Sequence, residues 1–137
     1  TDPELEARLA AAFHLKEVRV LVRDQKPYAE MTTLLGQLAA AYFADVVHEN
    51  SVIGISWGSA FYPMIQALRP LHLPEVEVVQ LIGASGSENV PTDGPVLAQL
   101  LAERLGSKCY YLHAPLLVDS EEARDALIRD RAIKETL

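Results

Sequence analysis

The ten residues V-I-G-I-S-W-G-S-A-F at positions 52–61 decide the fold of this chain. The apolar, β-branched start predicts a strand, the small residues predict a sharp turn, and the following run predicts a helix. Gly54, Ser56 and Gly58 also fit the G-x-S-x-G pattern of a hydrolase nucleophile elbow. The same turn could instead hold an anion, because the first backbone N–H groups of a helix have no partner within it. The stretch alone leaves both interpretations open.

Strands and helices alternate on both sides of this stretch. Helical spacing of apolar residues predicts helices at 3–14, 29–47, 60–68, 95–105, 120–129 and 132–137. Short β-branched runs predict strands at 17–22, 51–55, 76–82 and 108–112. This alternation predicts a Rossmann-like α/β fold, in which a parallel sheet is covered by helices on both faces. In such sheets ligands bind beyond the carboxyl ends of the strands.

A second turn of small residues, Gly83-Ala84-Ser85-Gly86, follows the strand expected at 76–82 and falls at the same edge of the sheet. Two such turns side by side favour a small ligand held by backbone amides and serine hydroxyls. The alternative for the glycines is local turn chemistry, and for the tryptophan it is an aromatic ring that covers the sheet. The candidate ligand-binding residues are Gly54, Ser56, Trp57, Gly58, Ser59, Gly83, Ala84, Ser85 and Gly86.

The hydrolase interpretation needs an acid and a histidine after the serine and an oxyanion loop before it. The order Ser56, Asp93, His113 can be imposed on the sequence. However, a single strand is expected before the elbow strand, and nothing upstream resembles a His-Gly-Gly loop. The turn also lacks the lysine of a Walker loop and the third glycine of a dinucleotide fingerprint. We therefore expect no catalytic residue, no cofactor and no enzyme.

The charge and composition of the chain exclude several kinds of binding partner. The chain has 19 acidic and 12 basic residues and a net charge of −7, which repels a phosphate backbone, so this segment is not expected to bind nucleic acid itself. No apolar run reaches the roughly 18 residues needed to cross a bilayer, and we expect a cytoplasmic protein. Cys109 is the single cysteine, and His14, His48 and His72 are isolated at the ends of expected elements, so no metal site is expected.

Several stretches together resemble the sugar-binding effector domain of SorC/DeoR-type bacterial transcriptional regulators. They are V-I-G-I-S-W-G-S-A at 52–60, V-V-Q-L-I-G-A-S-G at 78–86, L-A-E-R-L-G at 101–106, Y-L-H-A-P-L-L-V-D-S-E-E-A-R-D-A-L at 111–127 and I-K-E-T-L at 133–137. They cover most of the chain in the family's order and spacing. The resemblance implies a fold related to ribose-5-phosphate isomerase and glucosamine-6-phosphate deaminase.

The resemblance also implies a function. The ligand would be a sugar or a phosphorylated sugar that regulates and is not turned over. In the family the turn matching residues 56–59 faces the phosphate of the effector, and the turn matching residues 83–86 lines the pocket. This chain departs from the family at Ala84, where a second glycine is more frequent, and in a shorter polar loop before the next helix. A sugar-phosphate isomerase-like enzyme is the alternative, followed by the G-x-S-x-G hydrolase.

The resemblance places further parts outside residues 1–137. It implies a helix-turn-helix DNA reader before Thr1 and the second half of the effector domain after Leu137, so this segment would be a partial domain. Operator DNA would then be bound through the amino-terminal reader. The regulator is expected to be a homo-oligomer, either a dimer or a tetramer, without contact to a membrane.

Overall fold

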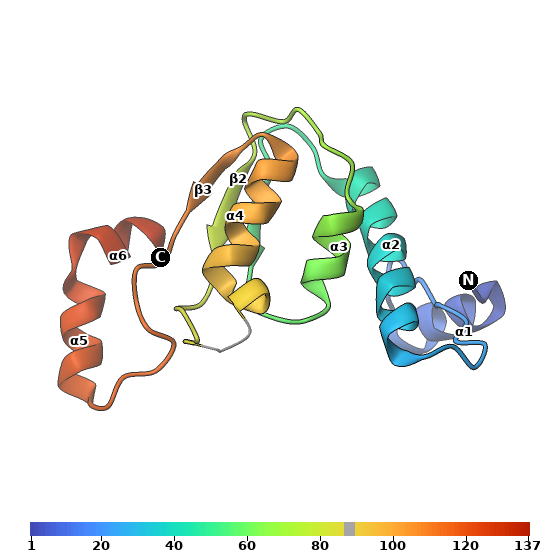
Figure 1. Cartoon of the computed structure of the whole chain (residues 1–137), viewed down its shortest axis with the longest axis horizontal. Helices are drawn as coiled ribbons and strands as arrows, with labels where there is room; N and C mark the ends of the chain where they lie inside the picture. Colours follow the sequence, from blue (N-terminus) through green and yellow to red (C-terminus); the bar gives the residue numbers. More distant parts are fainter. Residues whose placement is uncertain (87–89) are drawn as a thin grey trace.

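The computed structural model describes residues 1–86 and 90–137 (Figure 1). Its helices are α1 (Pro3–Phe13), α2 (Tyr28–Val46), α3 (Phe61–Ala67), α4 (Gly94–Leu105), α5 (Glu121–Arg129) and α6 (Arg131–Thr136), with a short 3-10 turn, η1 (Val90–Thr92). Its strands are β1 (Val52–Ile55), β2 (Glu77–Gln80) and β3 (Lys108–Tyr110). No helix among these residues is both long and apolar enough to cross a bilayer.

The three strands form one parallel sheet in the order β1-β2-β3. Val52 lies opposite Glu77, and Glu77 lies opposite Lys108, so the strands are in close register. α3 connects β1 to β2 and α4 connects β2 to β3. The expected parallel α/β sheet is therefore confirmed, with strands shorter than the sequence predicts. Because the strands are parallel, the turns after β1 and β2 lie at the same edge, which we call the rim.

One face of the sheet carries the core. Ile55, Val78 and Gln80 are almost completely buried on the side of α4, which contacts all three strands, and the positions between them along the strands are less buried. α3 packs beside α4 (Figure 1). On the opposite face, Val52 is 67% exposed and Leu81 is 57% exposed. Within the described part of the chain, α4 covers the core face with α3 beside it, and the other face is open, although the sequence predicts helices on both faces.

The long helix α2 packs against α3 through a close backbone contact. Gly36 is buried at the crossing, and a Cβ added there would lie 2.6 Å from the carbonyl carbon of Pro63 and 2.8 Å from the amide nitrogen of Met64. Since even a methyl group does not fit, glycine at this position sets the distance between the two helices. α2 thereby joins the amino-terminal part of the chain to α3, which follows the first turn, at residues 56–60.

The prediction that residues 17–22 form a strand of the sheet is wrong. Residues 17–23 pair with no strand among the described residues, and they run along α2 and α1 instead. The amide of Val20 donates to a carboxylate oxygen of Glu6 (2.8 Å), and the carbonyl of Val20 accepts from the amide of Asp2 (3.1 Å). Alternating apolar residues predict an extended conformation, but they do not identify the hydrogen-bonding partner.

The carboxyl-terminal helices form a small unit beside β3. The hydroxyl of Ser120 accepts from the amide of Ala123 (3.1 Å) and caps α5, which confirms the expected helix start. Asp130 caps α6 in the same way. Ile133 is 5% exposed, and the hydroxyl of Thr136 donates to the carbonyl of Tyr111 (3.1 Å). These contacts attach α6 to the segment that leaves β3.

Candidate functional site

β1 and the turn between β1 and α3 contain five of the predicted site residues, and the structure gives them different surroundings. Gly54 lies inside β1, where an added Cβ would be 2.6 Å from Cδ2 of Leu81, so this glycine accommodates a leucine side chain. The hydroxyl of Ser56 makes a long hydrogen bond to the carbonyl of Trp57 (3.4 Å). Trp57 is 53% exposed. Ser59 is exposed at the start of α3.

The amides of this turn are divided between the protein and the solvent. Gly58 has a φ of 154°, a conformation that favours glycine, and its amide donates to the carbonyl of Thr92 (3.1 Å). The amides of Ser59 and Ala60 make no hydrogen bond among the described residues. α3 has no side-chain cap, since Ala60 occupies the N-cap position. Two uncapped donors therefore point away from the start of this helix.

The second turn is held by the segment after β3. Gly83 is buried, and an added Cβ would lie 2.4 Å from the carbonyl oxygen of Ala114. The amide of Ala84 donates to that same carbonyl (2.9 Å), and the carbonyl of Ala84 accepts from the amide of Leu116 (2.9 Å). Gly86 is different, because its φ is 66° and no atom of residues 1–86 and 90–137 lies within 4 Å of an added Cβ. Gly83 is thus required by backbone packing, and Gly86 by its conformation.

Asp93 connects the second turn to α4. One of its carboxylate oxygens accepts from the amide of Ser85 (3.0 Å), the hydroxyl of Ser85 (2.8 Å) and the amide of Gly94 (3.0 Å). The backbone carbonyl of the neighbouring Thr92 accepts a hydrogen bond from the backbone amide of Gly58 in the first turn. The pair Thr92 and Asp93 therefore joins both turns at the start of α4. Sequence reasoning missed this role, although an aspartate before Gly-Pro is a recognisable helix N-cap.

The hydrogen bonds to Asp93 also change its acidity. Burial acts to raise the pKa of this carboxyl, but the hydrogen bonds from the amide and hydroxyl of Ser85 and the amide of Gly94 outweigh burial and lower the pKa. A carboxyl with a lower pKa in the folded state stabilises the fold above its unfolded pKa. This stabilisation is lost as the pH falls through the folded pKa. Asp93 therefore contributes to stability at neutral pH and not in strong acid.

Replacing Asp93 with asparagine tests this contribution. Asparagine still caps a helix, so we expect the variant to lose mainly the charge-assisted bonds to Ser85 and about 1 kcal/mol of unfolding free energy at neutral pH. The difference from wild type should shrink as the pH falls below the ordinary pKa of 3.8. Urea denaturation at a series of pH values measures it. The exposed Asp119→Asn is the control, and an equal loss in both variants would contradict the role of Asp93.

The three residues of the hydrolase interpretation do not form a catalytic triad. The hydroxyl of Ser56 and the carboxylate of Asp93 have the separate partners given above. The ring of His113 lies beside the ring of Tyr111, with 6.1 Å between the centroids. No hydrogen bond in the described part of the chain joins any two of Ser56, Asp93 and His113. The same part contains no group of three or more His, Cys, Asp or Glu side chains able to hold a metal ion.

A pocket of about 500 Å³ opens at the rim beside the second turn. Its lining includes Gln80, Ala84, Pro95, Tyr111 and His113, so Ala84 is the predicted site residue that it contains. Gln80 is 2% exposed. Its side-chain nitrogen Nε2 donates to the carbonyl of Ile82 (2.7 Å), and its side-chain oxygen Oε1 accepts from the backbone amide of Leu112 (3.2 Å). This side chain thereby fixes the ends of β2 and β3 around the pocket. Tyr111 and His113 were missed, although their place after the last strand was a usable signal.

A parallel sheet whose carboxyl edge carries uncapped amides and an open pocket is typical of small-ligand-binding domains of the α/β class. Comparison with known proteins identifies the family. The chain matches the Sugar-bind family of sugar-binding domains over residues 1–137. It therefore belongs to this family, which places it among the sugar-binding domains of SorC/DeoR-type transcriptional regulators.

Individual relatives agree with this placement. The chain is 30% identical over 129 residues to the deoxyribonucleoside regulator of Bacillus subtilis, covering 94% of the chain and 41% of that protein. It is similar to the full-length sorbitol operon regulator SorC of Klebsiella pneumoniae, with a TM-score of 0.92, 26% identity, and coverage of 98% of the chain and 44% of SorC. A DeoR family regulator of Listeria monocytogenes shares the fold at 23% identity, with a TM-score of 0.87 and coverage of 98% and 52%. The chain thus spans less than half the length of the first two regulators.

Proposed function

We propose that this chain is the effector-sensing part of a bacterial transcriptional regulator and that its effector is a phosphorylated sugar. The observation that carries the proposal is the rim itself. Thr92 and Asp93 hold the two turns together, and the amides of Ser59 and Ala60 have no hydrogen-bond partner within residues 1–86 and 90–137. A phosphate accepts hydrogen bonds from such amides, and the positive end of a helix favours its charge. The family supports a sugar as the ligand.

In this proposal the phosphate binds at the start of α3 and the sugar extends along the rim. The hydroxyl of Ser56 and the second turn lie on the same edge, next to the pocket that contains His113 and Tyr111. Trp57, Gly58 and Ser85 shape the two turns. Ser85 is held by Asp93, and the amide of Gly58 is held by Thr92, so we assign them a positioning role.

Regulation would follow from differential binding. The effector must bind one arrangement of the oligomer more tightly than another, and a coupling of about 1–3 kcal/mol would change operator affinity roughly 5- to 150-fold. Operator DNA would be bound outside this segment, whose net charge of −7 opposes contact with DNA. We propose a cytoplasmic homo-oligomer that does not turn its effector over, in keeping with relatives that are transcriptional regulators.

A charge placed at the rim tests the site. Ser59→Asp adds a negative charge beside the proposed phosphate, so we expect the affinity of the intact protein for sugar phosphates to fall at least about tenfold, equivalent to 1.4 kcal/mol. Calorimetric titration with ribose 5-phosphate, 2-deoxyribose 5-phosphate and glucitol 6-phosphate measures this, with the unphosphorylated sugars and inorganic phosphate alongside. Ala126→Asp makes the same change at an exposed position on α5 and should leave binding intact.

Two results would contradict the proposal. The first is binding by Ser59→Asp that equals binding by Ala126→Asp, because the phosphate would then lie elsewhere. The second is the appearance of a product when the bound sugar phosphate is analysed, which would favour the isomerase-like alternative.

A further inference from the structure

The hydrogen-bond donors around the second turn already have acceptors within the protein. The amide of Ala84 donates to the carbonyl of Ala114 (2.9 Å). The amide and the hydroxyl of Ser85 donate to Oδ1 of Asp93 (3.0 and 2.8 Å), and the amide of Gly94 donates to the same oxygen (3.0 Å). A phosphate binds through groups that donate hydrogen bonds to its oxygens. It would have to break these bonds to use the same donors.

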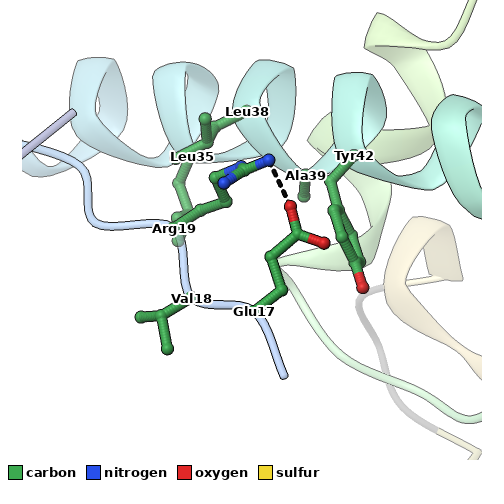
Figure 2. Close-up of a pocket in the computed structure, with 7 residues that line it drawn as sticks. All are labelled: Glu17, Val18, Arg19, Leu35, Leu38, Ala39 and Tyr42. Atoms are coloured by element: carbon green, nitrogen blue, oxygen red, sulfur yellow. Dashed lines mark ion pairs between the residues drawn. The ribbon is translucent and has the colours of Figure 1, made fainter. Parts of the chain in front are cut away.

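Asp93 also gives this turn a negative charge. Burial alone would raise the pKa of this carboxyl, but the hydrogen bonds from Ser85 and Gly94 lower it, so the group is ionised at neutral pH. All of these donors are neutral, and they stabilise the charge without cancelling it. Glu17 differs, because Figure 2 shows its carboxylate in an ion pair with Arg19 beside a pocket of about 250 Å³ on α2. The charge of Asp93 is not offset in this way by the groups that bind it.

The carboxylate lies beside the path that we propose for the effector. The carbonyl of Thr92, the preceding residue, accepts from the amide of Gly58 in the first turn (3.1 Å). On the other side, Ala84 and Pro95 line the rim pocket of about 500 Å³. Asp93 is bonded to the neighbour of Ala84 and is two residues from Pro95. An effector that extends from the start of α3 into this pocket therefore passes close to the charge.

We propose that Asp93 is a specificity-determining residue that favours hydroxyl groups of the sugar at the second turn and disfavours a second phosphate there. This inference rests on the proposed function, since it takes the first phosphate to lie at the start of α3. A hydroxyl can donate a hydrogen bond to a carboxylate, whereas a phosphate and a carboxylate repel each other. Selectivity often depends on such a repulsive group placed against the wrong ligand. The effector class is thereby narrowed to sugars that carry one phosphate.

The effect of Asp93 can be isolated from the contribution of the rest of the regulator. Any cationic side chain supplied from outside residues 1–137 is the same in the wild type and in a variant of this residue. Asp93→Asn removes the charge and keeps a side-chain oxygen that accepts hydrogen bonds. The change in the ratio of two affinities, one for a monophosphate and one for the matching bisphosphate, therefore reports on the charge of this residue.

Competition titration of the intact protein measures this ratio. The matched probes are ribose 5-phosphate with ribose 1,5-bisphosphate, and fructose 6-phosphate with fructose 1,6-bisphosphate. We expect Asp93→Asn to lower the ratio of the bisphosphate dissociation constant to the monophosphate dissociation constant about tenfold. The change should shrink in about 1 M salt, where the screening length is roughly 3 Å. A merely structural role would move both constants together and leave the ratio unchanged.

Two further variants separate charge from structure. Asp119→Asn removes a carboxylate from an exposed position before α5 and should leave the ratio unchanged. Ser85→Ala removes one hydrogen bond from the second turn and keeps the charge, so both dissociation constants should rise together.

The possible failures are distinguishable. An unchanged ratio in Asp93→Asn, an equal change in Asp119→Asn, or a bisphosphate that binds neither the wild type nor Asp93→Asn would overturn this inference while the proposed function stands. If no monophosphate binds the wild type, the proposed function is contradicted and this inference falls with it.

Discussion

Replacing Gly83 with alanine is expected to lower the free energy of unfolding by about 3 kcal/mol, the upper part of the range for forcing an extra methyl group into a packed site. The added Cβ would lie 2.4 Å from the carbonyl oxygen of Ala114 and 2.5 Å from the carbonyl carbon of Pro115. Both are backbone atoms that no rotamer change can move. For a chain of this length the loss corresponds to a fall in melting temperature of about 10 °C.

Gly86→Ala is the matched control in the same turn. Its φ of 66° makes alanine unfavourable, but an added Cβ meets no atom of the described residues within 4 Å, so a loss of about 1 kcal/mol is expected. Chemical denaturation followed by circular dichroism compares the two variants. If Gly83→Ala loses no more stability than Gly86→Ala, the segment at residues 114–115 yields easily and does not fix the second turn.

Replacing Gly36 with alanine should also lower the free energy of unfolding, by about 2 kcal/mol. The sign of this change distinguishes a steric clash from helix propensity, because the two have opposite effects. Helix propensity alone predicts that alanine stabilises the middle of α2 by about 1 kcal/mol relative to glycine. However, an added Cβ would lie 2.6 Å from the carbonyl carbon of Pro63 and 2.8 Å from the amide nitrogen of Met64. The two helices would have to separate, and the core contacts around α3 would loosen.

The reverse change on the exposed side of α2 calibrates this result. Ala41→Gly removes a methyl group at an exposed position of α2, so it should cost the propensity difference of about 1 kcal/mol. Thermal and urea denaturation of both variants give the comparison. A more stable Gly36→Ala protein would show that the contact between α2 and α3 has room to adjust.

Local patterns were sufficient to predict most of the elements. The alternation of helices and strands predicted the parallel sheet, and the helix ends carry short-range signals, such as Ser120 before α5 and Gly106 after α4. These signals depend on neighbours in the sequence, so they can be recognised without the fold. The segment at 17–22 could not be placed by the same means, because its alternation fixes a conformation and leaves the partner open.

The candidate site was predictable in position and less so in its internal contacts. Parallel strands bring their following turns to one edge, and both turns lie there. However, a glycine in a sequence indicates only that another part of the protein can lie too close for a side chain, and it does not identify that part. For Gly54 it is the side chain of Leu81, and for Gly83 it is the backbone at 114–115. The bonds from Gly58 to Thr92 and from Ser85 to Asp93 join distant residues, which no local pattern announces.

The crossing of α2 and α3 has a mechanical consequence. At Gly36 the helices meet backbone to backbone, so no side chain lies between them that could rotate and absorb a small shift. α3 starts directly after the first turn, and α2 borders residues 17–19 on its other side. A ligand that displaced the start of α3 would therefore move α2 with it as a rigid body. The displacement would then reach residues 17–19, which lie along the other side of α2.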